Sequence, residues 1–485
     1  MYQIPFDVAD ISYQEACDIL GSTKRFGIQP MLECVVDMNA ELNNPDDCFE
    51  SVQIAGTNGK TSTSRFAAQI LMGEGKKVAL YTSPELVSLC ERMEIMGHPI
   101  AEKDFAHGIA CAYEAGRRVN ERRAALGVRP YDITEFDLIT VAALVIFALA
   151  EVDVAVLECG MGGRWDATSA THNIKSVAIT GIGLDHMKIL GNTLEAIGAE
   201  KAAIIQESRT CVLGVGTATP PSLEDVFLER SHEVGVCPCL LRPERREDAA
   251  GEMHEGEMRE HRDLPHASYI IRQRPRRLGA PVILDVTSPL GVTYEGISAL
   301  KPSYQAANIA CAIVLCEQYL RRPLDAEALF DSVVRCPTPG RFDIVRAKPL
   351  MLIDACHNPQ GVQVFLDALD DIEPDRSKRP ALLCAHLADK DVSGMVKLLA
   401  AAFPHVYVTK THSSRALDEN ELAQLYKEIG AQVEGVFASV EEALSALGDQ
   451  DVVALGSITT AGEVAACLRP GVQNRRGGDD ITHSA

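Results

Sequence analysis

A glycine-bracketed loop between a strand pattern and a helical pattern constrains this chain most. Residues 52–55 (VQIA) are mostly apolar and predict a buried strand, and the apolar positions from Phe66 to Leu71 follow helical spacing. The loop between them reads GTNGKTS, residues 56–62. N–H groups at a helix start attract an anion, Lys60 adds positive charge, and Thr61 or Ser62 can reach Mg²⁺. The stretch predicts a nucleotide phosphate site; the competing interpretation is a tight turn with an accidental lysine.

A second constraint is an apolar strand pattern that ends in a carboxylate. Residues 152–159 read VDVAVLEC, as expected of a central parallel strand, and Glu158 lies at its carboxyl end. A carboxylate at that edge of a sheet, near a phosphate loop, is well placed for Mg²⁺. The stretch from Gly160 to Thr168 is rich in glycine, which allows the backbone to approach a ligand closely.

Composition limits the classes of partner. The chain has 485 residues, which predicts two or three domains, and its net charge of −22 argues against nucleic acid and anionic membranes as partners. The longest apolar run, residues 138–150, is too short to cross a bilayer. The N-terminus carries acids and no apolar signal core, and the 15 cysteines form no pair of CxxC elements. We expect a cytoplasmic monomer.

The sequence pattern divides the chain near residue 338. Residues 337–340 (PTPG) are stiff and contain glycine, which is typical of a hinge. From residue 350 strand patterns alternate with helical ones, which predicts a small Rossmann-like domain. We predict an α/β protein with a first domain at 1–338 and a second at 339–469. Residues 237–280 are expected to form an exposed charged insertion, and residues 470–485 a disordered tail.

Several motifs occur in an order that resembles one known family. The shortened G-x-x-G-K-T loop is similar to that of the ATP-dependent Mur-type amide ligases. Within that superfamily the chain resembles the folylpolyglutamate synthase/dihydrofolate synthase family, through residues 82–86 (TSPEL), 160–168 (GMGGRWDAT), 304–308 (YQAAN), 354–359 (DACHNP) and 387–391 (LADKD). The resemblance implies a P-loop-containing Mur-ligase-type ATPase domain plus a smaller Rossmann-like domain. It further implies that L-glutamate is ligated to dihydropteroate or tetrahydrofolate polyglutamates through an acyl phosphate, with ATP and two Mg²⁺ ions.

The resemblance also implies roles for individual residues. The expected ATP-binding residues are Gly56, Thr57, Asn58, Gly59, Lys60, Thr61, Ser62, Asn308, Arg341 and Asp354. The expected metal ligands are Ser83, Glu158, His186 and Lys201, the last as a carbamate. The expected pteroate- or folate-binding residues are Thr134, Glu135, Phe136, Asp137, Gly162, Gly163 and Arg164. The expected catalytic residues are Lys60, Lys201, His186 and His357.

Some of these residues have a second interpretation. Thr134, followed by acids, has the pattern of a helix N-cap, and this role is compatible with substrate binding by Asp137. Lys201 has the pattern of a surface helix lysine paired with Glu200 or Glu195. Apolar neighbours around Lys201 favour a neutral amine, which is the form that reacts with CO₂.

The chain departs from the family pattern at five positions, one of which is Ser169 in place of an asparagine. Glu85 and Tyr304 replace histidines, Asp137 replaces a glutamate and Trp165 replaces a leucine. Two alternatives for the whole chain stay open: a Mur-type ligase with a different carboxylate acceptor, and a non-catalytic ATP-binding protein.

Overall fold

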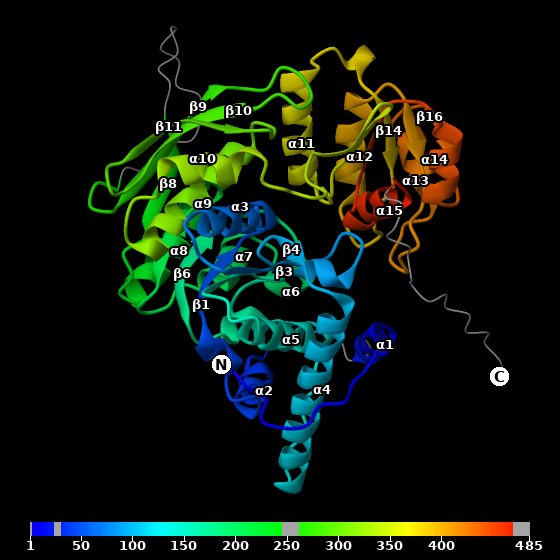
Figure 1. Cartoon of the computed structure of the whole chain (residues 1–485). Coiled ribbons are helices and arrows are strands. Elements are labelled where there is room, and N and C mark those ends of the chain that lie inside the picture. Colours follow the sequence, from blue (N-terminus) through cyan, green and yellow to red (C-terminus); the bar gives the residue numbers. More distant parts are fainter. Residues whose placement is uncertain (1, 24–30, 245–260, 469–485) are drawn as a thin grey trace, which may run out of the picture. The chain divides into compact units, whose positions relative to one another are not determined.

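The chain folds into two compact units. The computed structural model describes residues 2–23, 31–244 and 261–468 (Figure 1). Unit 1 comprises Met1–Glu85 and Leu89–Pro337, and unit 2 comprises Leu86–Ser88 and Thr338–Ala485. Leu86 is buried in the apolar core of unit 2, which explains why this short segment belongs there. The tail predicted at 470–485 lies outside the described residues.

One large sheet forms the centre of unit 1. Its strands are β1 (Glu50–Ala55), β2 (Val78–Tyr81), β3 (Met93–Ile95), β4 (His98–Pro99), β5 (Val154–Glu158), β6 (Ile174–Ile179), β7 (Thr210–Leu213), β8 (Cys239–Pro243), β9 (His266–Gln273), β10 (Val282–Thr287) and β11 (Thr293–Ala299). They form one 11-stranded sheet in the order β11-β10-β9-β8-β7-β6-β1-β5-β2-β3-β4. The strands from β9 to β2 run parallel, and antiparallel pairs complete both edges. The predicted α/β class is confirmed.

Helices cover both faces of this sheet. They are α1 (Tyr13–Thr23), α2 (Glu33–Glu41), α3 (Lys60–Gly73), α4 (Glu102–Ala125), α5 (Glu135–Leu149), α6 (Met187–Leu190), α7 (Leu194–Ala202), α8 (Pro221–Glu233), α9 (Gln305–Leu320) and α10 (Ala326–Val334). The 3₁₀ turns are η2 (Pro45–Cys48), η3 (Leu89–Arg92), η4 (Ala167–Ala170) and η5 (Val215–Thr217). Side chains alternate along a strand, so Val154 and Val156 pack with α3 and α9, whereas Ala155 and Leu157 pack with α4 and α5. In Figure 1, α3 and α9 lie next to each other, and α5 lies apart from them, below β1 in this view.

The helix α5 shows how local sequence and burial agree. Thr134 accepts a hydrogen bond from the Asp137 amide, and the Asp137 carboxylate accepts one from the Thr134 amide, so the two form a capping box. Every residue from Asp137 to Ala148 is buried. Although α5 is apolar, none of the helices described has the length and apolarity to cross a membrane.

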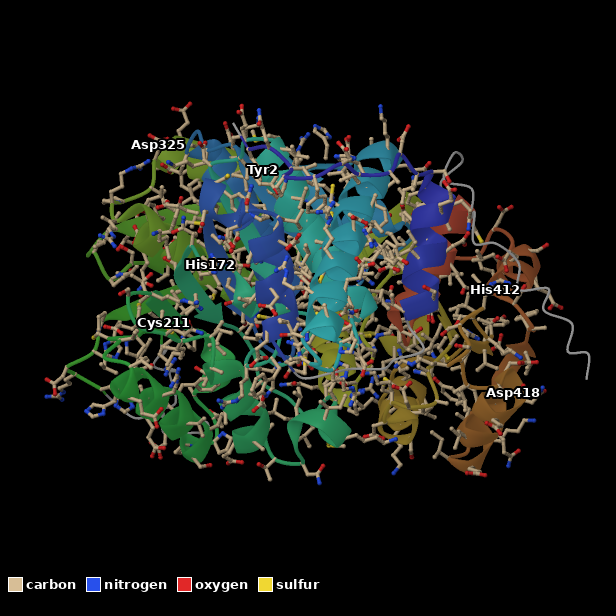
Figure 2. All side chains as sticks on the ribbon, turned by 90° about the horizontal axis from the view of Figure 1, so that it is seen from below. Tyr2, His172, Cys211, Asp325, His412 and Asp418 are labelled. Carbon is tan, nitrogen blue, oxygen red and sulfur yellow. The ribbon has the colours of Figure 1, made fainter. Side chains whose placement is uncertain are left out.

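Unit 2 is smaller and has an α/β fold of its own. Its elements are β12 (Asp343–Ala347), β13 (Leu350–Ile353), α11 (Pro359–Ile372), η6 (Arg376–Lys378), β14 (Ala381–Cys384), α12 (Val392–Ala402), β15 (Val406–Val408), α13 (Glu419–Glu428), β16 (Val433–Val436), α14 (Val440–Leu447), β17 (Val452–Leu455) and α15 (Ile458–Leu468). The sheet order is β12-β13-β17-β14-β15-β16, and only β12 is antiparallel to its neighbour. Asp418 caps α13 here, as Asp325 caps α10 in unit 1 (Figure 2).

The prediction of an exposed insertion across 237–280 is wrong at both of its ends. Cys239, Leu240 and Leu241 are buried in β8, which pairs in parallel with β7 and with β9. The strand β9 also pairs with β10, so it lies inside the sheet. Because the sequence between β8 and β9 is densely charged, the two short strands were not recognised. Residues 245–260 of that stretch lie outside the described residues.

Candidate active site

The phosphate loop connects the central strand β1 to the helix α3. Gly59 has a φ of 91°, a conformation that favours glycine. A Cβ there would lie 2.5 Å from Oδ1 of Asn308, so the loop has neither the backbone nor the space for a side chain. Nδ2 of Asn308 donates to Oε1 of Gln305 at 2.8 Å, which fixes the amide. The structure therefore brings Asn308, on α9, against the predicted phosphate loop.

Two amides of the phosphate loop are already hydrogen-bonded to the segment that follows β6. The amides of Thr57 and Asn58 donate to the carbonyl oxygen of Gly181 at 2.6 and 3.2 Å. The first amides of α3, from Lys60 onward, have no acceptor within their own helix, and they are the groups able to bind an anion. Nζ of Lys60 donates to the carbonyl oxygen of Thr57 at 3.2 Å, so the cation already lies over the loop.

The two hydroxyls that follow Lys60 have different hydrogen-bond partners. Oγ1 of Thr61 donates to Oε1 of Glu158 at 2.9 Å, at the carboxyl end of β5. Ser62 is buried and accepts from Nε2 of Gln305 at 3.0 Å. Of the two candidates, Thr61 is therefore the one that lies beside a carboxylate.

Ser83 follows the end of β2, the parallel neighbour of β5. Its Oγ is buried and has no hydrogen-bond partner among the described residues. Hydroxyl and carboxylate oxygens are the donors that Mg²⁺ prefers, and Ser83, Thr61 and Glu158 supply them at neighbouring strand ends. These residues fit the predicted metal.

Lys201 is a buried lysine. Its side chain is 4% exposed, and Nζ donates to the carbonyl oxygen of Gly56 at 2.8 Å. Burial, and secondarily the charge of Lys60, lowers the pKa of Lys201 to about 7. The amine thus lies against the phosphate loop and is readily neutral.

The surface-lysine interpretation of Lys201 is wrong. Glu200 pairs instead with Arg164, Oε1 to Nε at 2.9 Å, and Glu195 accepts from Oγ of Ser222 at 2.6 Å. Both carboxylates proposed as partners are therefore engaged elsewhere, and the lysine points inward.

His186 immediately precedes α6 and has a φ of 50°, in the left-handed region. Its Nε2 lies 3.8 Å from Oδ2 of Asp185, and its side chain is 43% exposed. Asp185 also acts on Lys201, since its charge opposes the lowering of the pKa of that amine. Asp185 therefore lies within electrostatic range of Lys201, and His186 is its neighbour in the chain.

The region expected to bind the acceptor packs on the glycine-rich stretch. A Cβ on Gly160 would lie 2.6 Å from Cζ of Phe136, and the Phe136 ring lies 6.1 Å from that of Tyr81, centroid to centroid. Asp137 is buried in the capping box, and burial raises the pKa of its carboxyl. Phe136 and Asp137 thus have structural roles at the start of α5, with Glu135 between Thr134 and Phe136.

Packing against α7 and the backbone conformation explain the two adjacent glycines Gly162 and Gly163. A Cβ on Gly163 would lie 2.8 Å from Cγ2 of Ile204 and 2.9 Å from the carbonyl oxygen of Glu200, and Gly162 has a φ of 68°. The Arg164 amide donates to that same carbonyl at 2.9 Å. The glycine-rich stretch is therefore fastened to the helix that carries Lys201.

The sequence interpretation missed Asp166 as a site residue. Its buried carboxylate accepts from the Met161 amide at 2.9 Å and from Oγ1 of Thr168 at 2.6 Å, and burial raises its pKa. Its charge also acts on Lys201. The Asp-Ala-Thr pattern of a turn N-cap is the signal that could have identified it.

Unit 2 carries the remaining predicted residues. The buried carboxylate of Asp354, after β13, accepts from the amides of Phe342 and Cys356 at 2.7 and 2.8 Å. Burial raises the pKa of this carboxyl, and Arg341 opposes the shift. Nδ1 of His357 lies 2.9 Å from the carbonyl oxygen of Ala355. Asp354 therefore joins the segment that follows Arg341 to the turn after β13 that carries His357.

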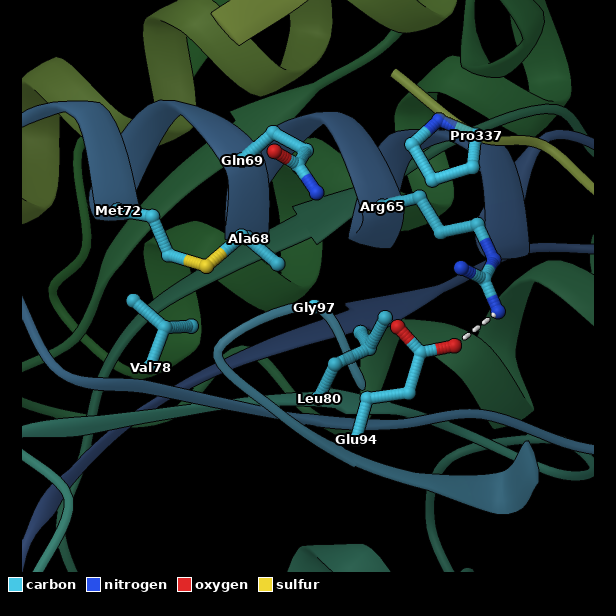
Figure 3. Close-up of a pocket in the computed structure, with 9 residues that line it drawn as sticks. All are labelled: Arg65, Ala68, Gln69, Met72, Val78, Leu80, Glu94, Gly97 and Pro337. Atoms are coloured by element: carbon cyan, nitrogen blue, oxygen red, sulfur yellow. Dashed lines mark hydrogen bonds and ion pairs between the residues drawn. The ribbon is translucent and has the colours of Figure 1, made fainter. Parts of the chain in front are cut away.

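A small pocket in unit 1 is lined by residues none of which is a predicted site residue. It lies between α3 and the strands β2 and β3, and Figure 3 shows its lining residues. At one end Nη2 of Arg65 meets Oε1 of Glu94 at 2.6 Å, and each side chain is 8% exposed. This ion pair joins the phosphate-loop helix to β3.

Family models cover most of the chain. Residues 54–233 match the Mur ligase middle domain, and residues 340–457 match the Mur ligase, glutamate ligase domain.

Relatives and solved structures agree with those models. The chain is 32% identical to the dihydrofolate synthase/folylpolyglutamate synthase of Mycobacterium tuberculosis, over 82% of this chain and 77% of that protein. It is 30% identical, over 93% of its length, to a probable bifunctional folylpolyglutamate synthase/dihydropteroate synthase of Haloferax volcanii, of which it spans half. A structure of the Mycobacterium tuberculosis folylpolyglutamate synthase complexed with ADP is similar, with a TM-score of 0.80, 27% identity, and coverage of 94% of this chain and 98% of that one.

Proposed function

Since this chain belongs to the folylpolyglutamate synthase/dihydrofolate synthase family of Mur ligases, we propose that it uses ATP to join L-glutamate to a pteroate or folate. The acceptors we propose are dihydropteroate, tetrahydrofolate polyglutamates, or both. The expectation of a cytoplasmic monomer stays a prediction.

The proposed reaction has two chemical steps. A carboxylate oxygen of the acceptor attacks the γ-phosphorus of ATP, the bond to the bridging oxygen breaks, and ADP leaves. The amine of glutamate then attacks the carbonyl carbon of the acyl phosphate, and phosphate departs with the electrons of the C–O bond while the amine loses a proton. Lys60 and the first amides of α3 would hold the phosphates and offset the charge that develops on them.

The oxygen ligands near the loop fit a divalent ion. Thr61, Ser83 and Glu158 would hold Mg²⁺, which neutralises phosphate charge and orients the γ-phosphoryl group. Glu158 is 1% exposed, so a cation also stabilises the ionised form of this buried carboxylate.

Lys201 would work as a carbamate. Its neutral nitrogen would attack CO₂ and lose a proton, which converts an amine into an anionic oxygen ligand. With His186 it would hold the second Mg²⁺. The position of Nζ on the carbonyl of Gly56 supports this role, because a permanent ammonium there would repel a metal beside the phosphates.

The acceptor and the rest of ATP would be bound by the other predicted residues. Thr134 to Asp137 and the stretch Gly162 to Arg164 would contact the pteroate or folate, and Asn308, Arg341 and Asp354 the nucleotide. His357 would lie near the glutamate or the phosphate, without an assigned role. For Asn308, the contact with Gly59 supports the assignment.

The observation that carries the proposal is the convergence at Gly56. The loop after β1 brings Lys60, the Thr61–Glu158 pair and the buried Lys201 together at the carboxyl ends of parallel strands. A protein that only binds nucleotide has no need for a buried amine with a lowered pKa in that place.

The test is ADP formation with dihydropteroate and with tetrahydrofolate, each with and without L-glutamate, together with the mass of the product. The proposal expects ADP and a glutamyl adduct only when acceptor and glutamate are both present. Lys103→Ala, on the exposed face of α4, is the matched control for substitution of Lys60 or Lys201, and it should behave as wild type. ADP formation that needs neither substrate indicates an ATPase, and no adduct with either acceptor indicates a different Mur-type ligase; both refute the proposal.

A further inference from the structure

Two aspartates and a histidine gather at the edge of the unit 1 sheet that is opposite to the phosphate loop. Asp46 and Asp47 belong to η2, just before β1, and His172 lies just before β6. The strands β1 and β6 are parallel neighbours, so their amino ends share one edge, where the Ser51 amide donates to the carbonyl of Asn173 at 2.9 Å. Figure 2 labels His172. None of these three side chains takes part in the proposed reaction.

The three side chains have the spacing of metal ligands. One ligand atom from each lies within 4.8 Å of the other two. Nδ1 of His172 lies 3.3 Å from Oδ1 of Asp47 and 3.5 Å from Oδ2 of Asp46. A tetrahedral ion with bonds of about 2.0–2.1 Å places its ligand atoms about 3.3–3.4 Å apart. The measured distances therefore suit a small ion with tetrahedral coordination.

A buried carboxylate in this cluster lacks a full set of partners. The Asp46 side chain is 0% exposed, and its Oδ2 accepts from the His172 amide at 2.7 Å. Its Oδ1 is buried and has no hydrogen-bond partner in the described parts of the chain. A cation at this position would be a partner for the buried carboxylate.

We propose that Asp46, Asp47 and His172 bind a divalent transition-metal ion of the Zn²⁺ type. One imidazole and two carboxylates form a mixed N/O donor set that suits Zn²⁺ better than Mg²⁺, and water completes the four ligands. His172 is 46% exposed and Asp47 59%, so the ion can enter from solvent. The bound ion ties the turn before β1 to the turn before β6.

The location fixes what such an ion does. It lies at the amino ends of the strands, whereas Lys60, Glu158 and Lys201 lie at or after the carboxyl ends. Binding therefore stabilises the folded chain by mass action and leaves the ligase chemistry unchanged.

The experiment uses the full chain, stripped with EDTA and kept in excess Mg²⁺, with Co²⁺ as a spectroscopic probe and Zn²⁺ as its competitor. Wild type should bind one equivalent of Co²⁺ more than His172→Ala, and Zn²⁺ should displace it. Asp47→Asn, which changes only an exposed carboxylate, should weaken binding by at least about ten-fold. Zn²⁺ should raise the unfolding temperature of wild type but not of His172→Ala.

His405→Ala is the matched control, because within the described residues His405 pairs with one carboxylate only, that of Glu434 in unit 2. It should bind Co²⁺ as wild type does. Equal Co²⁺ binding by wild type and His172→Ala overturns the proposal, because the ion is then bound elsewhere. Absence of Co²⁺ and Zn²⁺ binding by wild type also overturns it, and leaves the cluster as a set of hydrogen-bonded side chains only.

Discussion

Replacing Lys201 by methionine tests the state of its amine without any substrate. Methionine keeps an unbranched side chain of similar length and removes the titrating group. The pKa of Lys201 falls from 10.5 to about 7, a difference of 3.5, which corresponds to roughly 5 kcal/mol between the two protonation states at ~1.4 kcal/mol per pKa unit. The residue is 4% exposed, so solvent screens this difference little.

The sign of the pH dependence follows from proton binding. Between about pH 7 and pH 10.5 the unfolded chain holds a proton on Lys201 and the folded chain does not. The free energy of unfolding therefore rises with pH in that window, because the unfolded state binds more protons. For these two pKa values, the rise due to Lys201 between pH 8 and pH 10 is about 2–3 kcal/mol.

Urea unfolding under CO₂-free conditions measures this rise. Trp165, the only tryptophan, reports on unit 1 by its fluorescence. The free energy of unfolding of wild type should gain about 2–3 kcal/mol from pH 8 to pH 10 relative to Lys201→Met. Lys103→Met, exposed on α4, should follow wild type. Parallel pH profiles for wild type and Lys201→Met would refute the lowered pKa and remove the support for a carbamate.

Three further substitutions test other parts of the molecule. Lys60→Ala should keep the fold by circular dichroism and lose at least about ten-fold in kcat, a barrier increase of ~1.4 kcal/mol or more; a smaller loss contradicts the phosphate role. Asp137→Asn should raise KM for the pteroate or folate and leave KM for ATP nearly unchanged in steady-state assays, and the reverse pattern would move Asp137 out of the acceptor site. Arg65→Met should lower the free energy of unfolding by about 3–5 kcal/mol, because it leaves Glu94 buried and unpaired, and Arg65→Met with Glu94→Gln should recover much of it. Equal losses in the single and double variants would show that the charge of Glu94 is not the cause.

Local patterns in the sequence were sufficient for the framework of the phosphate site. The strand and helix periodicities on either side of residues 56–62 predicted β1 and α3, and the apolar run ending in Glu158 predicted β5. The pattern Thr134 to Asp137 predicted a helix start, and the structure has a capping box there. These features succeed because short-range backbone and burial preferences determine them.

The features that could not be predicted depend on contacts between residues that are far apart in the chain. Glu200 suggested a surface partner for Lys201, but Arg164, 36 positions earlier, pairs with that carboxylate only when the glycine-rich stretch packs against α7. Asp46 and His172 are 126 positions apart and meet because β1 and β6 are neighbours in the sheet. The strands β8 and β9 were missed because their short apolar stretches flank densely charged sequence. Such contacts follow from topology, which no local pattern encodes.

The most direct test of the proposed chemistry follows oxygen from the acceptor. The acceptor is supplied with ¹⁸O in both carboxylate oxygens, together with ATP, Mg²⁺ and L-glutamate, and the released phosphate is analysed by mass spectrometry. An acyl phosphate requires that one acceptor oxygen leaves with the phosphorus, so each inorganic phosphate should carry one ¹⁸O and the nucleotide product should be unlabelled ADP. Unlabelled phosphate, or label in AMP, would contradict an acyl-phosphate ligase.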